Sequence, residues 1–356
     1  MTSSYATPVS FVRGAVDTEL TAFAAERRAE LLEIGPELEP AMEALEAMLT
    51  GGKRLRPAFC YWGWRGAGGT DVPGIYTAAA SLEFLQACAL IHDDVIDNSD
   101  TRRGLPATHK RLEGLHRRSG WSGGGAAFGQ GAAILIGDLC LAWSDQMYAA
   151  SELPLKALHD GRGPFDRMRT EVMAGQYLDM LEQVRGAESV EASLRVMHYK
   201  AAKYTVERPL HLGAALAGRA DDLTPVYTAY GLPLGIAFQL RDDVLGVFGD
   251  PEQTGKPAGD DLREGKRTLI VAETLERAPA ADSARFRRLL GDPGLTPGDV
   301  EWMRGVTTEC GALAACERRI DDYVGQAADA LDSDLIDDEA RRSLADLIVA
   351  ATAREH

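Results

Sequence analysis

The most informative stretch of the chain is IHDDVIDNSDTRRG, residues 91–104, which ends a largely apolar run that begins at Tyr76. The run has apolar residues at three-and-four spacing and predicts a helix, on which Asp93 and Asp97 share a face with Asp94 beside them. These like charges repel one another, and the macrodipole at the end of a helix disfavours them further. A solvated helix end is the common alternative, but bound divalent cations explain acids at the end of a core helix better.

A second pair of aspartates, Asp242 and Asp243, ends another apolar helix, predicted over residues 231–240. The segment that follows, residues 249–267, is dense in Gly, Lys and Asp. Such a loop suits a phosphate that is held jointly by cations and a metal ion. Because two core helices both end in paired aspartates, we expect the two clusters to serve the same function, the binding of metal ions and phosphate.

The chain has 356 residues, with 54 acidic and 38 basic side chains and a net charge of −16. This charge argues against a broad nucleic-acid-binding surface, which needs clustered cations. The basic residues instead form small islands near the carboxylate clusters. Each of them alone is best explained as a solvated surface cation, but together they predict a site for small, highly charged phosphates. The islands contain Lys53, Arg54, Arg56, Arg102, Arg103, Lys203 and Lys266.

The periodicity predicts an all-α architecture in one domain, residues 1–356, because strand-like alternation is almost absent. The predicted helices cover residues 17–34, 37–49, 54–65, 74–97, 132–150, 165–184, 189–217, 225–247, 268–277, 297–333 and 337–353. The Gly-rich segment 119–131 is expected to be a surface loop. Five cysteines without a C-x-x-C pair, and no signal sequence or membrane-spanning run, predict a cytoplasmic protein with reduced thiols.

These motifs resemble those of the trans-isoprenyl diphosphate synthases, or polyprenyl synthetases. The family's first aspartate-rich motif and its R-R-G stand at residues 93–97 and 102–104. Its G-K-x-x-R-P stands at 52–57, and its G-Q-x-x-D at 175–179. The second aspartate-rich motif, with its neighbouring Gln, G-D and G-K elements, stands within 239–266. The motif-bearing core therefore covers about residues 52–266.

The resemblance implies a single large helical bundle of the isoprenoid synthase type around a central cavity, usually in a homodimer. It also implies head-to-tail condensation of isopentenyl diphosphate with an allylic diphosphate. Three Mg²⁺ ions would be held by Asp93, Asp97 and Asp242. The other residues carried over as catalytic are Asp94, Arg102, Lys203, Gln239, Asp243 and Lys266. Those carried over as substrate-binding are Lys53, Arg56, Gln86, Arg102, Arg103, Gln176, Thr205 and Lys256.

Two positions depart from the family pattern. The third aspartate of the second motif is replaced by Gly246, which predicts an altered third metal site rather than an inactive enzyme. The family has a Lys-Thr pair where this chain has Lys203 and Thr205, with Tyr204 inserted between them. This insertion leaves the role of the threonine open.

Product length is predicted from the residues four, five and eight positions before Asp93, namely Ala89, Cys88 and Leu85. Farnesyl diphosphate synthases usually place bulky aromatic residues at the first two of these positions, where this chain has small ones. Burial of each further isoprene unit is favourable, at about 25 cal/mol per Å². Geranylgeranyl diphosphate is therefore the first choice, with a deeper floor at Leu85 and Phe84, and a longer polyprenyl product is the second. Ordinary helix packing explains the small residues equally well.

Three other functions compete with this one. A terpene cyclase of the same fold usually coordinates metal through an Asn-Ser-Glu triad, and the single asparagine, Asn98, argues against it. A non-catalytic subunit of a heteromeric prenyl synthase is a second alternative, since such subunits tend to lose aspartate motifs. An acidic helical scaffold is the third, and it leaves both carboxylate clusters unexplained.

Overall fold

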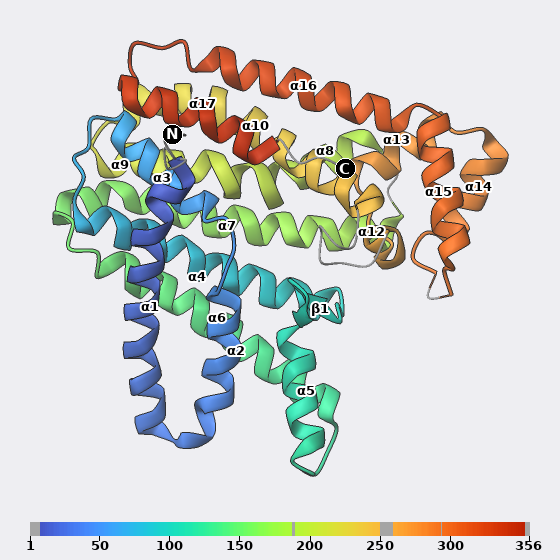
Figure 1. Cartoon of the computed structure of the whole chain (residues 1–356), viewed down its shortest axis with the longest axis horizontal. Helices are drawn as coiled ribbons and strands as arrows, with labels where there is room; N and C mark the ends of the chain where they lie inside the picture. The colour runs from blue at the N-terminus through green and yellow to red at the C-terminus, as the bar shows by residue number, and fades with distance from the viewer. Residues whose placement is uncertain (1–7, 187–188, 250–258, 293, 353–356) are drawn as a thin grey trace, which may run out of the picture. The chain divides into compact units, whose positions relative to one another are not determined.

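Helices make up almost all of the structure, a computed structural model that describes residues 8–186, 189–249, 259–292 and 294–352. The one sheet in these ranges is a short antiparallel hairpin of β1 (Thr101–Arg102) and β2 (Leu105–Pro106), in which Thr101 pairs with Pro106. The predicted all-α class is confirmed (Figure 1). The hairpin directly follows the first aspartate cluster.

The chain divides into two compact units, which are described separately here. Unit 1 comprises residues 1–165, 209–223 and 335–346, and unit 2 comprises residues 166–208, 224–334 and 347–356. The single domain expected over residues 1–356 stays a prediction. The first aspartate cluster belongs to unit 1, and the second belongs to unit 2.

Unit 1 is built around one apolar helix, α4 (Pro73–Ile96), which packs along α6 (Gly125–Ala149) (Figure 1). Because α4 is apolar on nearly every side, it becomes a core helix rather than an amphipathic surface helix. Phe84 of α4 packs edge-on against Phe23 and Trp143. The other elements of unit 1 are α1 (Pro8–Ile34), η1 (Pro36–Leu38), α2 (Glu39–Leu49), α3 (Leu55–Gly66) and α5 (Thr108–Arg118), with parts of α7, α9, α10 and α17.

Unit 2 is built around the larger part of α10 (Ala220–Phe248). One core cluster joins Val244, Leu262, Phe286 and Met303, all nearly inaccessible to solvent. The other elements of unit 2 are most of α7 (Leu155–Arg185), α8 (Val190–Met197), η2 (His198–Glu207), α12 (Asp260–Glu264), α13 (Leu269–Arg277), α14 (Ala280–Leu289), α15 (Pro297–Glu309), α16 (Ala312–Ala330) and the end of α17 (Asp338–Thr352). Helix α9 (Arg208–Leu216), which follows η2, belongs mostly to unit 1.

The structure corrects several predicted helix bounds. Helices α5 and α14 were not predicted, because their sequences are polar and α5 is rich in basic residues. The expected loop 119–131 is wrong in its second half, since α6 begins at Gly125. Packing of α6 against α5 outweighs the low helix propensity of its glycines. The single helix expected over 297–333 is two helices, separated at Gly311, whose φ is 80°.

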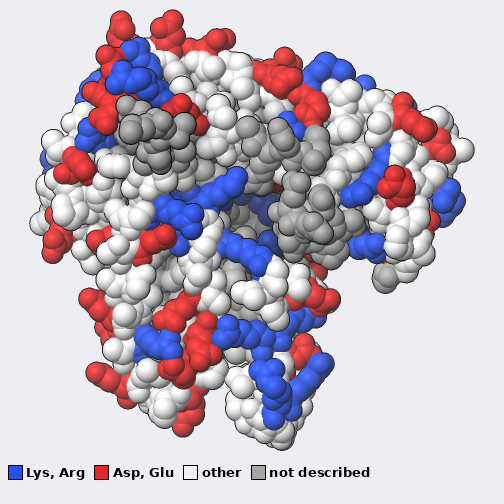
Figure 2. All heavy atoms as spheres, in the orientation of Figure 1, with Lys and Arg blue, Asp and Glu red and all other residues white. Residues whose placement is uncertain are grey.

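Two helices are long and apolar enough to cross a membrane by length and composition alone, α4 and α6. The apolar window of α4 is 72% buried, as in the core helix of a globular protein, whereas that of α6 is only 28% buried. The absence of a membrane segment and the cytoplasmic location therefore stay predictions. Figure 2 shows acidic side chains over much of the visible face, with Lys and Arg gathered over α5.

Candidate active site

The first aspartate cluster forms where α4 ends. The backbone N–H of Asp97 donates to the carbonyl of Asp93 at 2.8 Å, and the chain then turns through Asn98, whose φ is 51°. This turn leads into the β1–β2 hairpin, which brings Arg102 back to the helix. The short hairpin is therefore what joins the aspartates to the R-R-G segment.

Arg102 binds the aspartates rather than standing apart as a separate cation. Its Nε donates to Asp94 Oδ1 at 2.9 Å, its Nη2 also contacts that oxygen, and Nη2 lies 3.4 Å from Asp93 Oδ2. Asp94 is fully buried, whereas Asp93 and Asp97 are partly exposed. Asp94 therefore holds Arg102 in place, while the exposed oxygens of the cluster belong to Asp93 and Asp97.

Several partly exposed residues near the end of α4, which also has others such as Leu90 and His92, form a stripe that ends at the cap residue Asp97. Gln86, Ala89, Asp93 and Asp97 follow one another at spacings of three and four residues, so they share a face of the helix. Ala89 is therefore the chain-length candidate on the same face as the metal candidates. The other two, Leu85 and Cys88, are buried, at 1% and 2% exposure.

A buried arginine organises the first basic island. Arg54 has a left-handed backbone, with a φ of 54°, and its side chain is only 5% exposed. Its Nε donates to Asp17 at 2.8 Å and its Nη1 to Glu83 at 2.5 Å. These two ion pairs tie the loop between α2 and α3 to α1 and α4. Neighbouring Lys53 is exposed and Arg56 is partly exposed.

Arg103 joins the two basic islands of unit 1. Its Nη1 donates to the carbonyl of Thr50, at 3.0 Å, just before the Gly-Lys segment. Burial lowers the pKa of Arg103; the nearby cations Arg54, Arg102 and Arg56 lower it further, although Glu83 opposes them. A cation that is disfavoured by other cations is well placed to bind an anion, because the anion relieves the repulsion.

The second aspartate cluster lies within α10 in unit 2, because the helix continues past Asp242 and Asp243 to Phe248 and does not end at residue 240 as predicted. Gln239 donates to Asp243 Oδ1 at 2.8 Å, and Asp243 is 6% exposed while Asp242 is partly exposed. Burial raises the pKa of Asp243 to about 8, and its neighbours Asp261 and Asp242 raise it further, against the lowering effects of Gln239 and Lys266. Burial and the two neighbouring carboxyl groups thus favour the protonated form of Asp243.

Gly246, which replaces the third aspartate of the second motif, lies against another carboxylate. A Cβ placed on Gly246 would lie 1.9 Å from Asp261 Oδ2 and 2.5 Å from Asp261 Cγ. The carboxylate of Asp261, on α12, therefore occupies the space beside this backbone position. Asp261 falls in the segment 249–267 that was predicted to suit a phosphate, but only the fold shows that α12 returns it to α10.

The remaining candidates of unit 2 are held in ion pairs. Lys266 Nζ lies 2.6 Å from Glu264 and 3.6 Å from Asp261, so it belongs to the second aspartate cluster. Lys203 Nζ lies 3.1 Å from Glu207 and 3.8 Å from Glu171. Both acidic partners of Lys203 were missed: the four-residue spacing to Glu207 could have indicated that pair, whereas Glu171 is on another helix and has no such signal.

The Tyr204 insertion coincides with an unusual helix. Residues His198–Glu207 form a π-helix, η2, in place of the ordinary α-helix expected there. A π-helix accommodates an extra residue within a turn and is frequent at functional sites. Thr205 is 1% exposed, while Gln176 on α7 is partly exposed. Lys256 lies outside the described residues.

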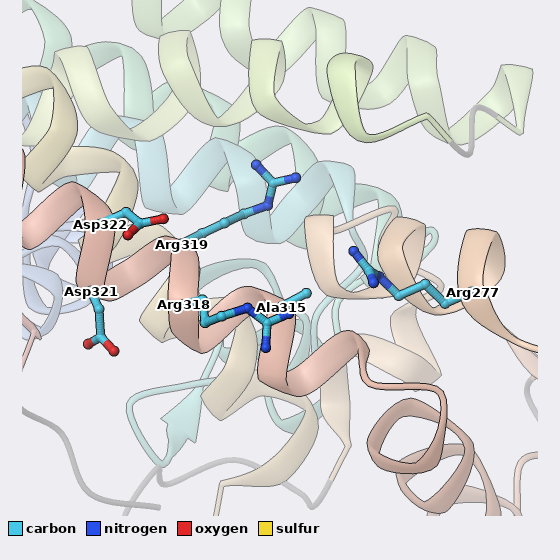
Figure 3. Close-up of a pocket in the computed structure, with 6 residues that line it drawn as sticks. All are labelled: Arg277, Ala315, Arg318, Arg319, Asp321 and Asp322. Atoms are coloured by element: carbon cyan, nitrogen blue, oxygen red, sulfur yellow. The ribbon is translucent and has the colours of Figure 1, made fainter.

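Unit 2 also has an open pocket of about 410 Å³ beside α13 and α16 (Figure 3). It is lined by Arg277, Ala315, Arg318, Arg319, Asp321 and Asp322. The buried carboxylate of Glu273 pairs with Arg277 at 2.6 Å and with Arg319 at 2.9 Å. None of the lining residues belongs to a predicted motif.

Comparison with known proteins identifies the family. The model of the polyprenyl synthetase family matches residues 39–304. The chain belongs to this family. A crystal structure of geranylgeranyl pyrophosphate synthase from Corynebacterium glutamicum, complexed with isoprenyl diphosphate and magnesium, is 40% identical, with a TM-score of 0.94 over 98% of this chain and 99% of that one. The isoprenoid synthase fold is thereby confirmed.

Curated relatives agree on the reaction but differ in product. Geranylfarnesyl diphosphate synthase of Aeropyrum pernix is 32% identical over 81% of this chain and 85% of its own length. Geranylgeranyl diphosphate synthase of Methanosarcina mazei is 31% identical over 79% of this chain and 80% of its own length. The protein is a prenyltransferase that elongates trans-prenyl diphosphates. Identity at this level leaves its product length to be argued from its own residues.

Proposed function

We propose that the protein condenses isopentenyl diphosphate with allylic diphosphates to form geranylgeranyl diphosphate. The observation that carries this proposal is the stripe on α4, where small Ala89 lies one turn before Asp93 on the same face. A small side chain there leaves room for a growing chain beside the diphosphate site. The magnesium-bound geranylgeranyl pyrophosphate synthase of Corynebacterium glutamicum supports the same product.

A longer product is the second candidate. The next residue along the stripe is Gln86, which is partly exposed and has no aromatic ring to close a channel. Phe84, the nearest aromatic residue on α4, is fully buried against Phe23 and Trp143. The stripe therefore has no aromatic side chain in the turns before Asp93, and its largest apolar neighbour is the partly exposed Leu90.

The carboxylates fit magnesium by their chemistry. In the part of the chain that the structure describes, no three acidic, His or Cys side chains form a closed metal site by themselves. Magnesium commonly takes one or two carboxylates and completes its shell with waters and substrate phosphates. Asp93 and Asp97 would hold two ions and Asp242 a third, and all three residues are partly exposed. Bound magnesium supplies the positive charge that stabilises a departing diphosphate.

The cations of unit 1 form the proposed isopentenyl diphosphate site. Lys53 and Arg56 flank the buried Arg54, whose ion pairs with Asp17 and Glu83 fix the loop. Arg103 reaches the same segment through its contact with Thr50. Arginine forks bind phosphate oxygens through paired N–H groups, so this cluster would fix the orientation of the nucleophilic alkene.

The other side chains position the allylic substrate. Arg102, held by Asp94, would donate to its diphosphate, as would Lys203 and Lys266 after they exchange their carboxylate partners. The alkene carbon of isopentenyl diphosphate forms the new carbon–carbon bond as the allylic carbon–oxygen bond breaks. One proton leaves the product, and the released diphosphate accepts it, so no side-chain nucleophile is required.

A homodimer is part of this proposal. Phe128 and Leu135 on α6 are 39% and 66% exposed and, seven residues apart, lie on one side of the helix, while Ile134, next to Leu135, is 46% exposed. A second copy of the chain would cover this side and remove it from water. Light scattering should report a dimer for the wild type and a monomer for Leu135→Asp; a wild-type monomer would contradict the assignment.

The product assay tests the proposed reaction. Purified protein, magnesium and labelled isopentenyl diphosphate are incubated separately with dimethylallyl, geranyl and farnesyl diphosphates, and the products are sized by chromatography. A geranylgeranyl product is expected from each primer. A ladder beyond this length supports the second candidate, whereas no incorporation from any primer overturns the proposal.

A further inference from the structure

His92, next to the first aspartate cluster, is partly exposed and contacts the neighbouring helix. It lies in the last turn of α4, and its Nε2 is 3.1 Å from the carbonyl oxygen of Ile134 on α6. Because a carbonyl can only accept, Nε2 carries the hydrogen and donates it. This bond joins α4 to α6 at the residue that directly precedes Asp93.

The contact depends on Gly137 of α6. A Cβ placed on Gly137 would lie 2.1 Å from His92 Nε2, 2.4 Å from Cδ2 and 2.9 Å from Cε1. Ordinary contacts begin near 3.4 Å, so the imidazole occupies space that only glycine leaves open. The imidazole ring therefore packs against α6 at Gly137, where the helix has no side chain.

The second ring nitrogen also has a partner. With the hydrogen on Nε2, His92 Nδ1 is an acceptor, and the thiol of Cys88, one turn earlier, lies 3.7 Å from it. Burial raises the pKa of Cys88 to about 12, as does the nearby Asp138, so the thiol keeps the proton that it donates. The thiol is thereby directed at the His92 ring.

We propose that His92 is a positioning residue that seats the last turn of α4 against α6 at Gly137 and so fixes the first carboxylate cluster for magnesium. The backbone of Asp93 follows His92 directly, and the N–H of Asp97 is bonded to the Asp93 carbonyl. Movement of the imidazole is therefore passed to both metal candidates. This inference rests on the proposed function, in which Asp93 and Asp97 bind magnesium.

A double-mutant cycle of Gly137→Ala and His92→Ala tests the inference, with magnesium half-saturation, kcat and Tm as readouts. Gly137→Ala should raise the magnesium concentration needed for half-maximal rate about tenfold in the wild type, because the new methyl group displaces the ring. In the His92→Ala background it should have no further effect on magnesium and should raise Tm slightly, since alanine favours a helix over glycine. His92→Gln, which can still donate to the Ile134 carbonyl, should restore part of the wild-type value.

The matched control is Gly163→Ala on α7, where an added Cβ would meet nothing within 4 Å. It should leave magnesium half-saturation unchanged. Additive effects in the cycle, or a loss of Tm without any change in magnesium half-saturation, would overturn the inference. The variant Asp93→Asn distinguishes failure of the proposed function from failure of the role of His92. If Asp93→Asn keeps the wild-type magnesium dependence, the proposed function fails. If Asp93→Asn loses that dependence but the effects in the double-mutant cycle are additive, only the role of His92 is overturned.

Discussion

Restoring the family's aspartate at position 246 should harm this protein. The Gly246→Asp change recreates the missing third carboxylate of the second motif, so sequence comparison alone would expect an improvement. The structure predicts the reverse, because Asp261 Oδ2 lies 1.9 Å from where the new Cβ would stand. Even Gly246→Ala meets this obstacle.

The expected cost follows from the contact distances. Moving an oxygen from 1.9 Å to the 3.4 Å at which ordinary contacts begin requires a shift of about 1.5 Å in a packed site. Overpacking of this kind costs roughly 1–3 kcal/mol, and the gain in helix propensity returns about 1 kcal/mol. Gly246→Ala should therefore lose up to about 2 kcal/mol of stability. The aspartate adds like-charge repulsion of up to about 4 kcal/mol near Asp261.

Thermal unfolding with and without magnesium, together with prenyl transfer rates, measures these effects. Both variants should unfold at lower temperature than the wild type, and magnesium should recover more of the loss for Gly246→Asp than for Gly246→Ala. The compensating double variant Gly246→Asp/Asp261→Ala moves the carboxylate from α12 to α10 and should regain stability. If Gly246→Ala is about 1 kcal/mol more stable than the wild type, as helix propensity alone would make it, Asp261 does not obstruct this position and the reasoning is refuted.

Three further predictions concern the substrate sites. Ala89→Phe places a ring on the stripe of α4 and should shorten the product to farnesyl or geranyl length, as chromatography would show. An unchanged product length would mean that other residues limit the length of the chain. Arg103→Gln removes a charged donor worth about 1.5–3 kcal/mol and should raise the KM for isopentenyl diphosphate tenfold or more while that for the allylic primer changes little; equal changes in both would contradict the assignment. The pKa of Asp243 is raised from 3.8 to about 8, so the folded state binds more protons than the unfolded state between these values. Stability without magnesium should thus fall as pH rises from about 4 to 8, by at most about 1.4 kcal/mol per pH unit, whereas denaturation curves that are flat across this window would exclude a raised pKa.

The sequence predicted the long apolar helices well, because their periodicity is strong and their burial is nearly complete. Prediction from the sequence failed where tertiary packing overrides the local helix propensity. The helical segment that begins at Gly125 contains several glycines, and α5 is polar enough to resemble a surface loop. The π-helix His198–Glu207 was also unforeseen, although the inserted Tyr204 was the signal that could have indicated it.

The candidate site was predictable where its residues are close in sequence. One-turn spacing brought Asp93 and Asp97 to one face, and the structure retains that arrangement. Contacts between distant segments could not be derived in this way. The pairing of Arg54 with Glu83 and the approach of Asp261 to Gly246 depend on how helices return to one another.

Diffraction from crystals grown with manganese and an unreactive allylic diphosphate analogue tests the central claim most directly. Manganese substitutes for magnesium and is located by its anomalous signal. The account predicts ions about 2.0–2.2 Å from carboxylate oxygens of Asp93, Asp97 and Asp242, each also bound to the diphosphate. Ions on other side chains, or a diphosphate bound without contact to these three aspartates, would contradict it.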